Sequence, residues 1–96
     1  MSFPKYLVEF IGTFIFLSVI LSTGQALPIG IALMSVIYFG GKVSGGNYNP
    51  AVSTMMLMKG ELNVQDFIAY VFAQILGGIF ALLFYIHFVK KKNKKT

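Results

Sequence analysis

The chain has 96 residues, of which 56% are hydrophobic and 11% are charged, whereas soluble domains carry about 25% charged residues. This composition indicates a membrane protein, and the absence of cysteine excludes a disulfide framework and a thiolate metal site. The net charge of +5 comes mostly from the lysine-rich stretch at residues 90–96, which favours an anchor at a lipid headgroup surface. Nucleic-acid binding is not expected, because no other part of the chain resembles a basic groove.

The first apolar segment, residues 6–22, is long enough to cross a bilayer as a slightly short helix. A lysine before it, Lys5, would also suit a signal peptide, but Glu9 lies one turn into the apolar run, where a signal sequence should hold no carboxylate. A carboxylate at membrane depth is costly and usually faces a polar partner or a water-filled space. We therefore expect Glu9 to accept hydrogen bonds from an irregular backbone further along the chain, within residues 40–49.

The second apolar segment, residues 27–39, follows a short polar turn and is expected to run antiparallel to the first. Pro28 lies in its first turn, where proline is tolerated. Ala26 and Gly30 are four residues apart, and such a pair of small residues lets another helix approach closely.

The stretch that follows differs from the apolar segments on either side, because it opens with glycines and polar residues before a short apolar run. Asn49 is a favoured helix N-cap, and Pro50 suits the first turn of the helix that it would begin. The sequence therefore predicts an irregular loop over residues 40–49 and a helix over residues 50–58. This helix is too short to span a bilayer, so we expect it to be re-entrant.

The longest apolar segment, residues 67–89, is the third predicted transmembrane helix. Asn63 can cap it, and Asp66 suits the positive end of its dipole. Small residues recur every four positions and predict a stripe for close helix packing: Ala69, Ala73, Gly77 and Ala81. His87 has no acid or cysteine nearby, so we expect it at the membrane interface and not in a metal site.

The predicted fold is an all-α membrane protein in one unit over residues 1–96, with three transmembrane helices and one re-entrant half-helix. Two crossings return the chain to the side of its N-terminus, so the half-helix enters from that side. Three crossings place the basic tail, residues 90–96, on the other side. Lysines occur on both sides, so the positive-inside rule favours neither orientation.

The half-helix would bring an N-terminus to mid-membrane, where its unpaired N–H groups and dipole carry about half a positive charge. The amide of Asn49 could donate to a passing water or hydroxyl, and the carbonyls of residues 42–47, if extended, could accept. Such a lining suits a neutral hydrogen-bonding solute and repels cations. The alternative is a buried capping turn without conduction. An enzyme is not expected, because the three acids form no pair with His87, and no cofactor or metal is implied.

Three motifs occur in a fixed order between residues 6 and 86: EFIGT at 9–13, SGGNYNPAV at 44–52 and AQILGG at 73–78. They resemble the E-x-x-G-T of the first helix, the SGxHxNPAV signature and the third helix of the aquaporin and glycerol facilitator (major intrinsic protein) family. Members of this family usually contain two such halves, inverted relative to each other, whereas this chain has one.

The resemblance implies a role for each matching residue. The NPA motif, Asn49, Pro50 and Ala51, is expected at the channel centre, with Asn49 donating to the permeant. The expected braces of the loop are Glu9, Gln74 and Asn47, the last where histidine is usual. The motif glycine Gly12 is expected in helix packing, together with Gly30. The candidates for a constriction are Ile29, Gly46 and Val52, the last where second halves usually carry an arginine.

Three helices and one half-helix cannot enclose a pore, but a second copy in the opposite orientation would restore the arrangement of inverted repeats. We therefore expect a passive channel for water or small neutral solutes such as glycerol. Its smallest conducting unit would be an antiparallel homodimer in membrane lipid, with four pores per assembly as in the family's tetramer. The alternatives are a non-conducting membrane protein that pairs with another aquaporin-like chain, and a fragment without a function of its own.

Overall fold

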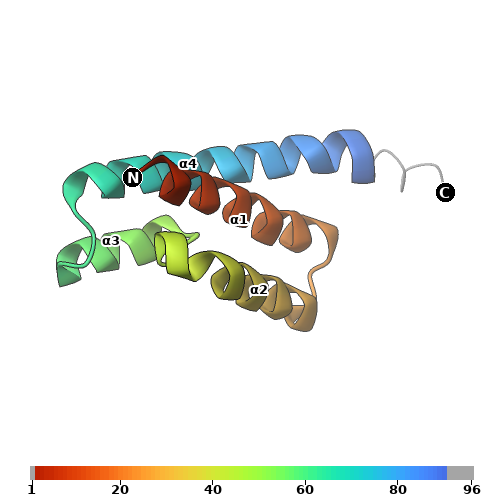
Figure 1. Cartoon of the computed structure of the whole chain (residues 1–96). Helices are drawn as coiled ribbons and strands as arrows, with labels where there is room; N and C mark the ends of the chain where they lie inside the picture. The colour runs from red at the N-terminus through yellow and green to blue at the C-terminus, as the bar shows by residue number, and fades with distance from the viewer. Residues whose placement is uncertain (1, 91–96) are drawn as a thin grey trace.

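The computed structural model describes residues 2–90, and within this range the chain is entirely helical between short connections (Figure 1). The helices are α1 (Phe3–Ser22), α2 (Ala26–Ser44), α3 (Pro50–Lys59) and α4 (Val64–Phe84), and α4 continues into the π-helix η1 (Tyr85–Lys90). The prediction of an all-α fold is confirmed for this part of the chain.

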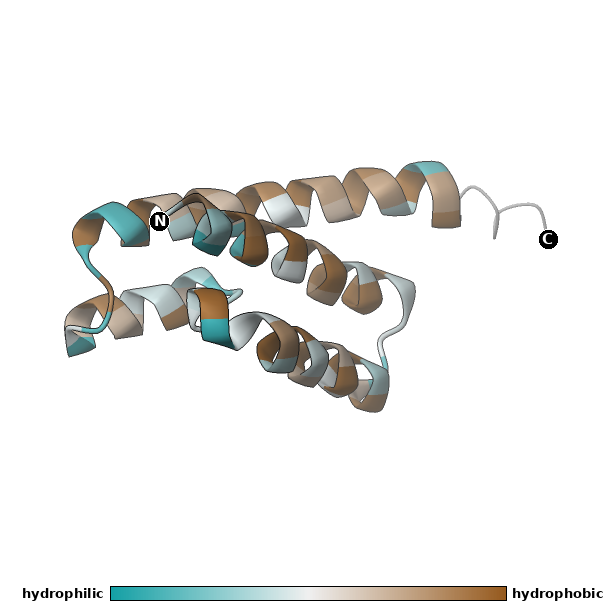
Figure 2. Ribbon diagram, viewed as in Figure 1, coloured by the Kyte–Doolittle hydropathy of each residue, from teal (hydrophilic) through white to brown (hydrophobic). Residues whose placement is uncertain are grey.

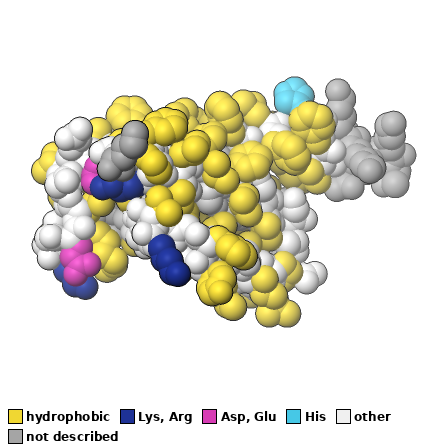
Figure 3. Space-filling model, in the orientation of Figure 1, with side chains coloured by type: hydrophobic (Ala, Val, Ile, Leu, Met, Phe, Trp, Pro, Cys, Tyr) yellow, Lys and Arg dark blue, Asp and Glu magenta, His cyan; other side chains and the backbone are white. Residues whose placement is uncertain are grey.

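Three of these elements are long and apolar enough to cross a membrane, namely α1, α2 and the continuous helix Val64–Lys90. The fourth, α3, has only 10 residues. Apolar residues predominate along the long helices, as the hydropathy colouring shows (Figure 2). In the space-filling view, apolar side chains cover much of the visible surface, and most charged side chains lie at the end where α1 and α4 begin (Figure 3). The predicted architecture of three spanning helices and one half-helix is confirmed.

The arrangement in space follows from the short turn after α1. Helix α2 runs back along α1, whereas α1 and α4 point in the same direction and lie side by side (Figure 1). Helix α3 begins near the middle of the molecule and runs back toward the end where α1 and α4 begin. The molecule measures 50 × 23 × 20 Å, and all four helices run roughly along its long axis (Figure 1).

The second helix is longer than predicted, and this corrects the extent of the loop. Residues 40–44 of the predicted irregular loop belong to α2, so within that loop only residues 45–49 lie outside the helices. Two glycines at positions 40 and 41 did not end the helix, because a helix satisfies its own backbone groups in an apolar setting. It ends where Gly45 takes φ = 91° and donates to the Gly41 carbonyl at 2.8 Å.

This correction removes part of the expected ladder of carbonyl acceptors. The carbonyls of residues 42–44 lie in the last turn of α2, and that of Ser44 already accepts a hydrogen bond from the Tyr70 hydroxyl. The other helix limits differ by a few residues: α1 begins at Phe3, and α4 begins at Val64, directly after its N-cap Asn63.

Helices α1 and α4 make the most extensive helix–helix contact in the described structure, and this contact uses the small residues of α4. Ala73, Gly77 and Ala81 are buried there, and Ala69 is half-buried. A Cβ built at Gly77 would lie only 2.9 Å from the Phe10 carbonyl oxygen. Gly30, in contrast, is exposed with no other group within 4 Å of a Cβ built on it, so its role in helix packing stays a prediction.

A side chain at Gly77 should therefore separate α1 from α4. We expect Gly77→Val to lower the free energy of unfolding by about 3 kcal/mol, since its Cβ meets backbone atoms that cannot rotate away. The measurement is unfolding in lipid bicelles. The matched control is Gly30→Val on α2, where the side chain meets open space. An equal loss at both positions would show that helix propensity, and not this contact, sets the effect.

Candidate functional site

The segment between α2 and α3, residues 45–49, reverses the chain through backbone conformations that glycine favours. Gly45 has φ = 91° and Gly46 has φ = 67°, in the left-handed region where most side chains are strained. Tyr48 also lies in this region, with φ = 57°, although it carries a large side chain. A residue in such a conformation costs about 1–3 kcal/mol, so surrounding contacts must hold it there.

A carboxylate on α1, that of Glu9, supplies the main contacts to this segment. Its Oε2 accepts hydrogen bonds from the Ser44 hydroxyl at 2.7 Å and from the Asn47 backbone N–H at 2.9 Å. Its Oε1 accepts from the Tyr48 backbone N–H at 2.7 Å and from Gln74 Nε2 at 3.0 Å. Glu9 is 0% exposed, and these four donors fill the acceptor positions of a carboxylate.

A second layer of polar contacts joins the loop to the two helices that follow it. Asn47 Nδ2 donates to the Ser53 hydroxyl of α3 at 3.0 Å, and Gln74 Nε2 donates to the same oxygen at 2.8 Å. The structure thus brings together the three predicted braces, Glu9, Gln74 and Asn47, around one loop. Ser53 is not among the residues predicted from the sequence, where its only signal is its place one turn after the Asn49 cap.

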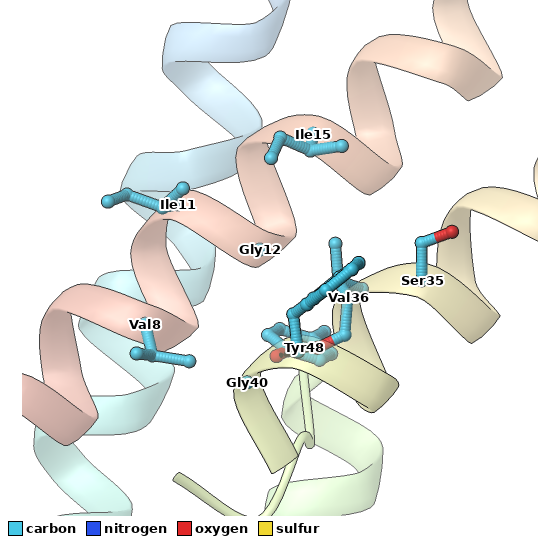
Figure 4. Close-up of a pocket in the computed structure, with 9 residues that line it drawn as sticks. Val8, Ile11, Gly12, Ile15, Ser35, Val36, Gly40 and Tyr48 are labelled. Atoms are coloured by element: carbon cyan, nitrogen blue, oxygen red, sulfur yellow. Dashed lines mark hydrogen bonds between the residues drawn. The ribbon is translucent and has the colours of Figure 1, made fainter. Parts of the chain in front are cut away.

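The Tyr48 side chain is a further contact that the sequence analysis missed. Figure 4 shows its ring between α1 and α2, near Gly12 on one helix and Gly40 on the other. A Cβ built at either glycine would overlap with the ring or its hydroxyl, and the hydroxyl donates to the Val36 carbonyl. The ring thus borders an apolar cavity of about 300 Å³ and holds Tyr48 in its strained conformation. Gly12 therefore makes room for an aromatic ring.

An ion pair ties the start of α1 to the start of α4. Lys5 Nζ lies 2.8 Å from Asp66 Oδ2, and the Tyr6 hydroxyl donates to Asp66 Oδ1 at 2.6 Å. Asn63 caps α4, since its Oδ1 accepts from the Asp66 backbone N–H at 2.7 Å. The sequence related Asp66 to the dipole of its own helix, but it did not predict Lys5 or Tyr6 as partners, because sequence spacing does not show which distant residue meets it.

The residues of the NPA motif lie on the surface of the chain, at a groove between α1, α4 and the loop. Asn49, Pro50 and Ala51 are all exposed, and the first two line this groove of about 480 Å³. Asn49 Oδ1 accepts from the Ala51 backbone N–H at 2.7 Å, which caps α3. Its Nδ2 makes no hydrogen bond within residues 2–90, so it can donate to a molecule in the groove. The positive end of the α3 dipole lies at the same place.

The three constriction candidates do not meet in one chain. Ile29 lies in the first turn of α2, whereas Gly46 lies two residues after Ser44, the last residue of that helix. At about 1.5 Å of rise per residue, the helix from Ile29 to Ser44 alone is about 22 Å long. Val52 is half-buried in the first turn of α3. Their role in a constriction stays a prediction, and it requires residues from more than one chain.

The other expected features lie away from this groove. His87 is exposed in η1, and residues 2–90 contain no cluster of three or more His, Asp or Glu side chains that could hold a metal ion. The basic tail predicted at residues 90–96 lies outside the described residues, except for Lys90.

The family model and the known proteins that match this chain agree with one another. The family model of the major intrinsic proteins matches residues 2–96. A "Glycerol uptake facilitator protein-like 6" of Lactiplantibacillus plantarum is 45% identical over 87 residues, which cover 80% of this chain and 40% of that protein. An "Aquaporin Z" of Brucella melitensis is 43% identical over 58 residues, which cover 60% of this chain and 25% of that protein. No solved structure matches the chain significantly.

The carboxylate at the loop provides a direct test of this geometry. Glu9→Gln replaces one acceptor oxygen with an NH₂ group that would face hydrogen-bond donors. We expect the free energy of unfolding to fall by about 3 kcal/mol or more, because buried donors lose an ionised acceptor. Unfolding of the purified chain in bicelles measures this change.

The control for that substitution is Glu61→Gln. Glu61 is exposed after α3, and its Oε2 lies 3.4 Å from Lys59 Nζ. Such a surface pair should contribute less than about 1 kcal/mol to the free energy of unfolding. If both variants were equally stable, the four hydrogen bonds to Glu9 would not hold the loop.

Proposed function

Because this chain belongs to the major intrinsic protein family, we propose that two copies of it, inserted in opposite orientations, form a passive channel for water or small neutral solutes such as glycerol. The chain is an integral, multi-pass membrane protein. The observation that carries the proposal is the position of Asn49, at the start of α3, near the middle of the molecule and open to a groove.

The chemistry of this position suits an uncharged permeant. The free Nδ2 of Asn49 can donate to a water or hydroxyl oxygen, and the start of α3 contributes a positive potential that disfavours cations. The rest of the groove is mostly apolar, which gives a passing solute few positions where it binds tightly. A solute with one or more hydroxyl groups can therefore pass without a charged residue in its path.

The need for a second copy follows from the open groove. One chain supplies one wall and one half-helix, and it spans about two-fifths of its glycerol facilitator-like relative and a quarter of its aquaporin relative. An inverted second copy would bring a second α3 to the first at mid-membrane, as inverted repeats do in other transport proteins. The exposed Asn49 of each copy would then face one shared path.

Antiparallel pairing would also place the constriction candidates at the same depth in the membrane. Ile29 lies at the end of the molecule opposite to its own α3, because α3 runs back toward the start of α1. Inversion places the partner copy's α3 at the Ile29 end. We propose that Ile29 of one copy and Gly46 and Val52 of the other form an apolar constriction, and that this constriction occurs twice in each pore. Four such pores would form the complete assembly.

Replacing the donor should stop conduction without unfolding the chain. We expect Asn49→Leu to lower water and glycerol permeability of proteoliposomes to the level of empty liposomes, measured by stopped-flow light scattering. The control is Asn63→Leu, which removes the N-cap of α4 in the same way but lies away from the groove. Equal permeability of the Asn49 variant and the wild type would exclude this hinge as the conducting site.

Dual orientation is a separate requirement of the homodimer. The chain has no cysteine, so Gly24→Cys in the open turn between α1 and α2 provides a single label. We expect a membrane-impermeant reagent added to one side to label about half of the molecules, as balanced lysines predict. Labelling of all molecules from one side would rule out the antiparallel homodimer.

The non-conducting alternative has its own signature in the same assays. A chain that pairs with another aquaporin-like protein should give no permeability alone, with one orientation, and should change permeability only when both proteins are reconstituted together.

A further inference from the structure

Two polar atoms between α1 and α4 lack a hydrogen-bond partner in the described structure: Thr13 Oγ1 and Gln74 Oε1. The two residues are 1% and 2% exposed, so neither atom is open to solvent. An unpaired hydroxyl or amide oxygen is costly in an apolar environment, and inside a membrane each polar group must find a partner internally. Both residues line the groove that contains Asn49.

The hydroxyl of Thr13, like that of Ser18 on the same helix, has no hydrogen-bond partner in the described structure, in contrast to other helical hydroxyls of this chain. Those of Ser22, Ser35 and Thr54 each donate to the carbonyl four residues earlier, at 2.9, 2.8 and 2.8 Å. Thr13 does not close onto its own helix in this way. Its O–H group is therefore available to a partner that lies off the helix axis, toward α4.

The orientation of the Gln74 amide is fixed by its other contacts. Its Nε2 donates to the Glu9 carboxylate at 3.0 Å and to the Ser53 hydroxyl at 2.8 Å. Rotating the amide by half a turn would place Oε1 against that carboxylate, with repulsion between two acceptors. The Oε1 atom must therefore remain an acceptor on the other side of the amide.

The two unpaired atoms belong to adjacent layers of the helix contact, one formed by Thr13 and Gly77 and the other, one turn earlier, by Glu9 and Gln74. Thr13 follows Glu9 by one turn of α1, and Gln74 precedes Gly77 by one turn of α4. A Cβ built at Gly77 would lie 3.0 Å from the Thr13 Cβ, which shows how closely the helices meet in the first of these layers. A hydroxyl that can donate and a carbonyl oxygen that can accept thus occur together, next to the groove.

We propose that Thr13 and Gln74 bind one internal water molecule. Water is the only ligand small enough to enter this close helix contact that can both accept from Thr13 and donate to Gln74. It would reach the site from the groove. Bound there, it completes the hydrogen bonds of Gln74 and so supports the amide that holds Glu9 and Ser53. This site does not depend on conduction by the chain.

The test is water-edited solid-state NMR on the full chain in lipid bilayers. We expect magnetisation to pass from water to the Thr13 methyl group, and not to the Ser35 side chain, whose hydroxyl is already bonded to its own helix. In Thr13→Val, which keeps the shape but lacks the hydroxyl, transfer to this position should be lost. In Thr13→Ser it should persist.

Two results would overturn the proposal. One is a wild-type spectrum in which Thr13 receives no more magnetisation from water than Ser35 does, which would mean that Thr13 and Gln74 pair directly. The other is equal transfer in the wild type and Thr13→Val. Both measurements remain informative if proteoliposomes of the wild type prove impermeable, so a failure of the channel and a failure of the water site can be told apart.

Discussion

The Glu9 carboxylate is the interaction on which the site depends, because it compensates for backbone that no helix can satisfy. A chain that reverses direction at membrane depth exposes N–H groups to a medium without water. Glu9 accepts two of these N–H groups, from Asn47 and Tyr48, and adds side-chain donors from Ser44 and Gln74. One buried charge thereby joins α1, the end of α2, the loop and α4. The cost of burying it is offset by four hydrogen bonds to an ionised acceptor.

Asn49 differs from the residues that Glu9 holds in both exposure and hydrogen bonding. Asn47 and Tyr48, just before it, are buried and hydrogen-bonded to Glu9, whereas Asn49 itself is exposed with a free amide nitrogen. The strained backbone of Tyr48 produces this change of direction, and the ring locked between Gly12 and Gly40 maintains it. The Asn49 amide donor is therefore preorganised, because no further free energy is needed to order it when a solute arrives. The contacts of Glu9 and Tyr48 therefore both fix the loop backbone and leave Asn49 open to the groove.

The sequence predicted the helices and the hinge because these depend on local signals. Apolar runs of sufficient length, a cap at Asn49 and a proline after it are all readable within a few residues. The end of α2 was misjudged, because glycines that weaken a helix in water do not end it in an apolar setting. Contacts between distant residues could not be predicted from the sequence. Nothing near Asp66 indicates Lys5, and nothing near Tyr48 indicates the two glycines that contact its ring. Glu9 was the exception, since a lone carboxylate in an apolar run demands a partner somewhere.

The separation of Glu9 from its partners has a consequence for biogenesis. Its donors lie 35 to 39 residues later in Ser44, Asn47 and Tyr48, and 65 residues later in Gln74. Proteins are synthesised from the N-terminus, so α1 leaves the ribosome with a carboxylate that nothing can yet pair. The insertion machinery must therefore shelter α1, or hold it near water, until the third spanning helix has been made. Release into lipid then becomes a late and concerted step, in which the loop, α4 and Glu9 come together at once.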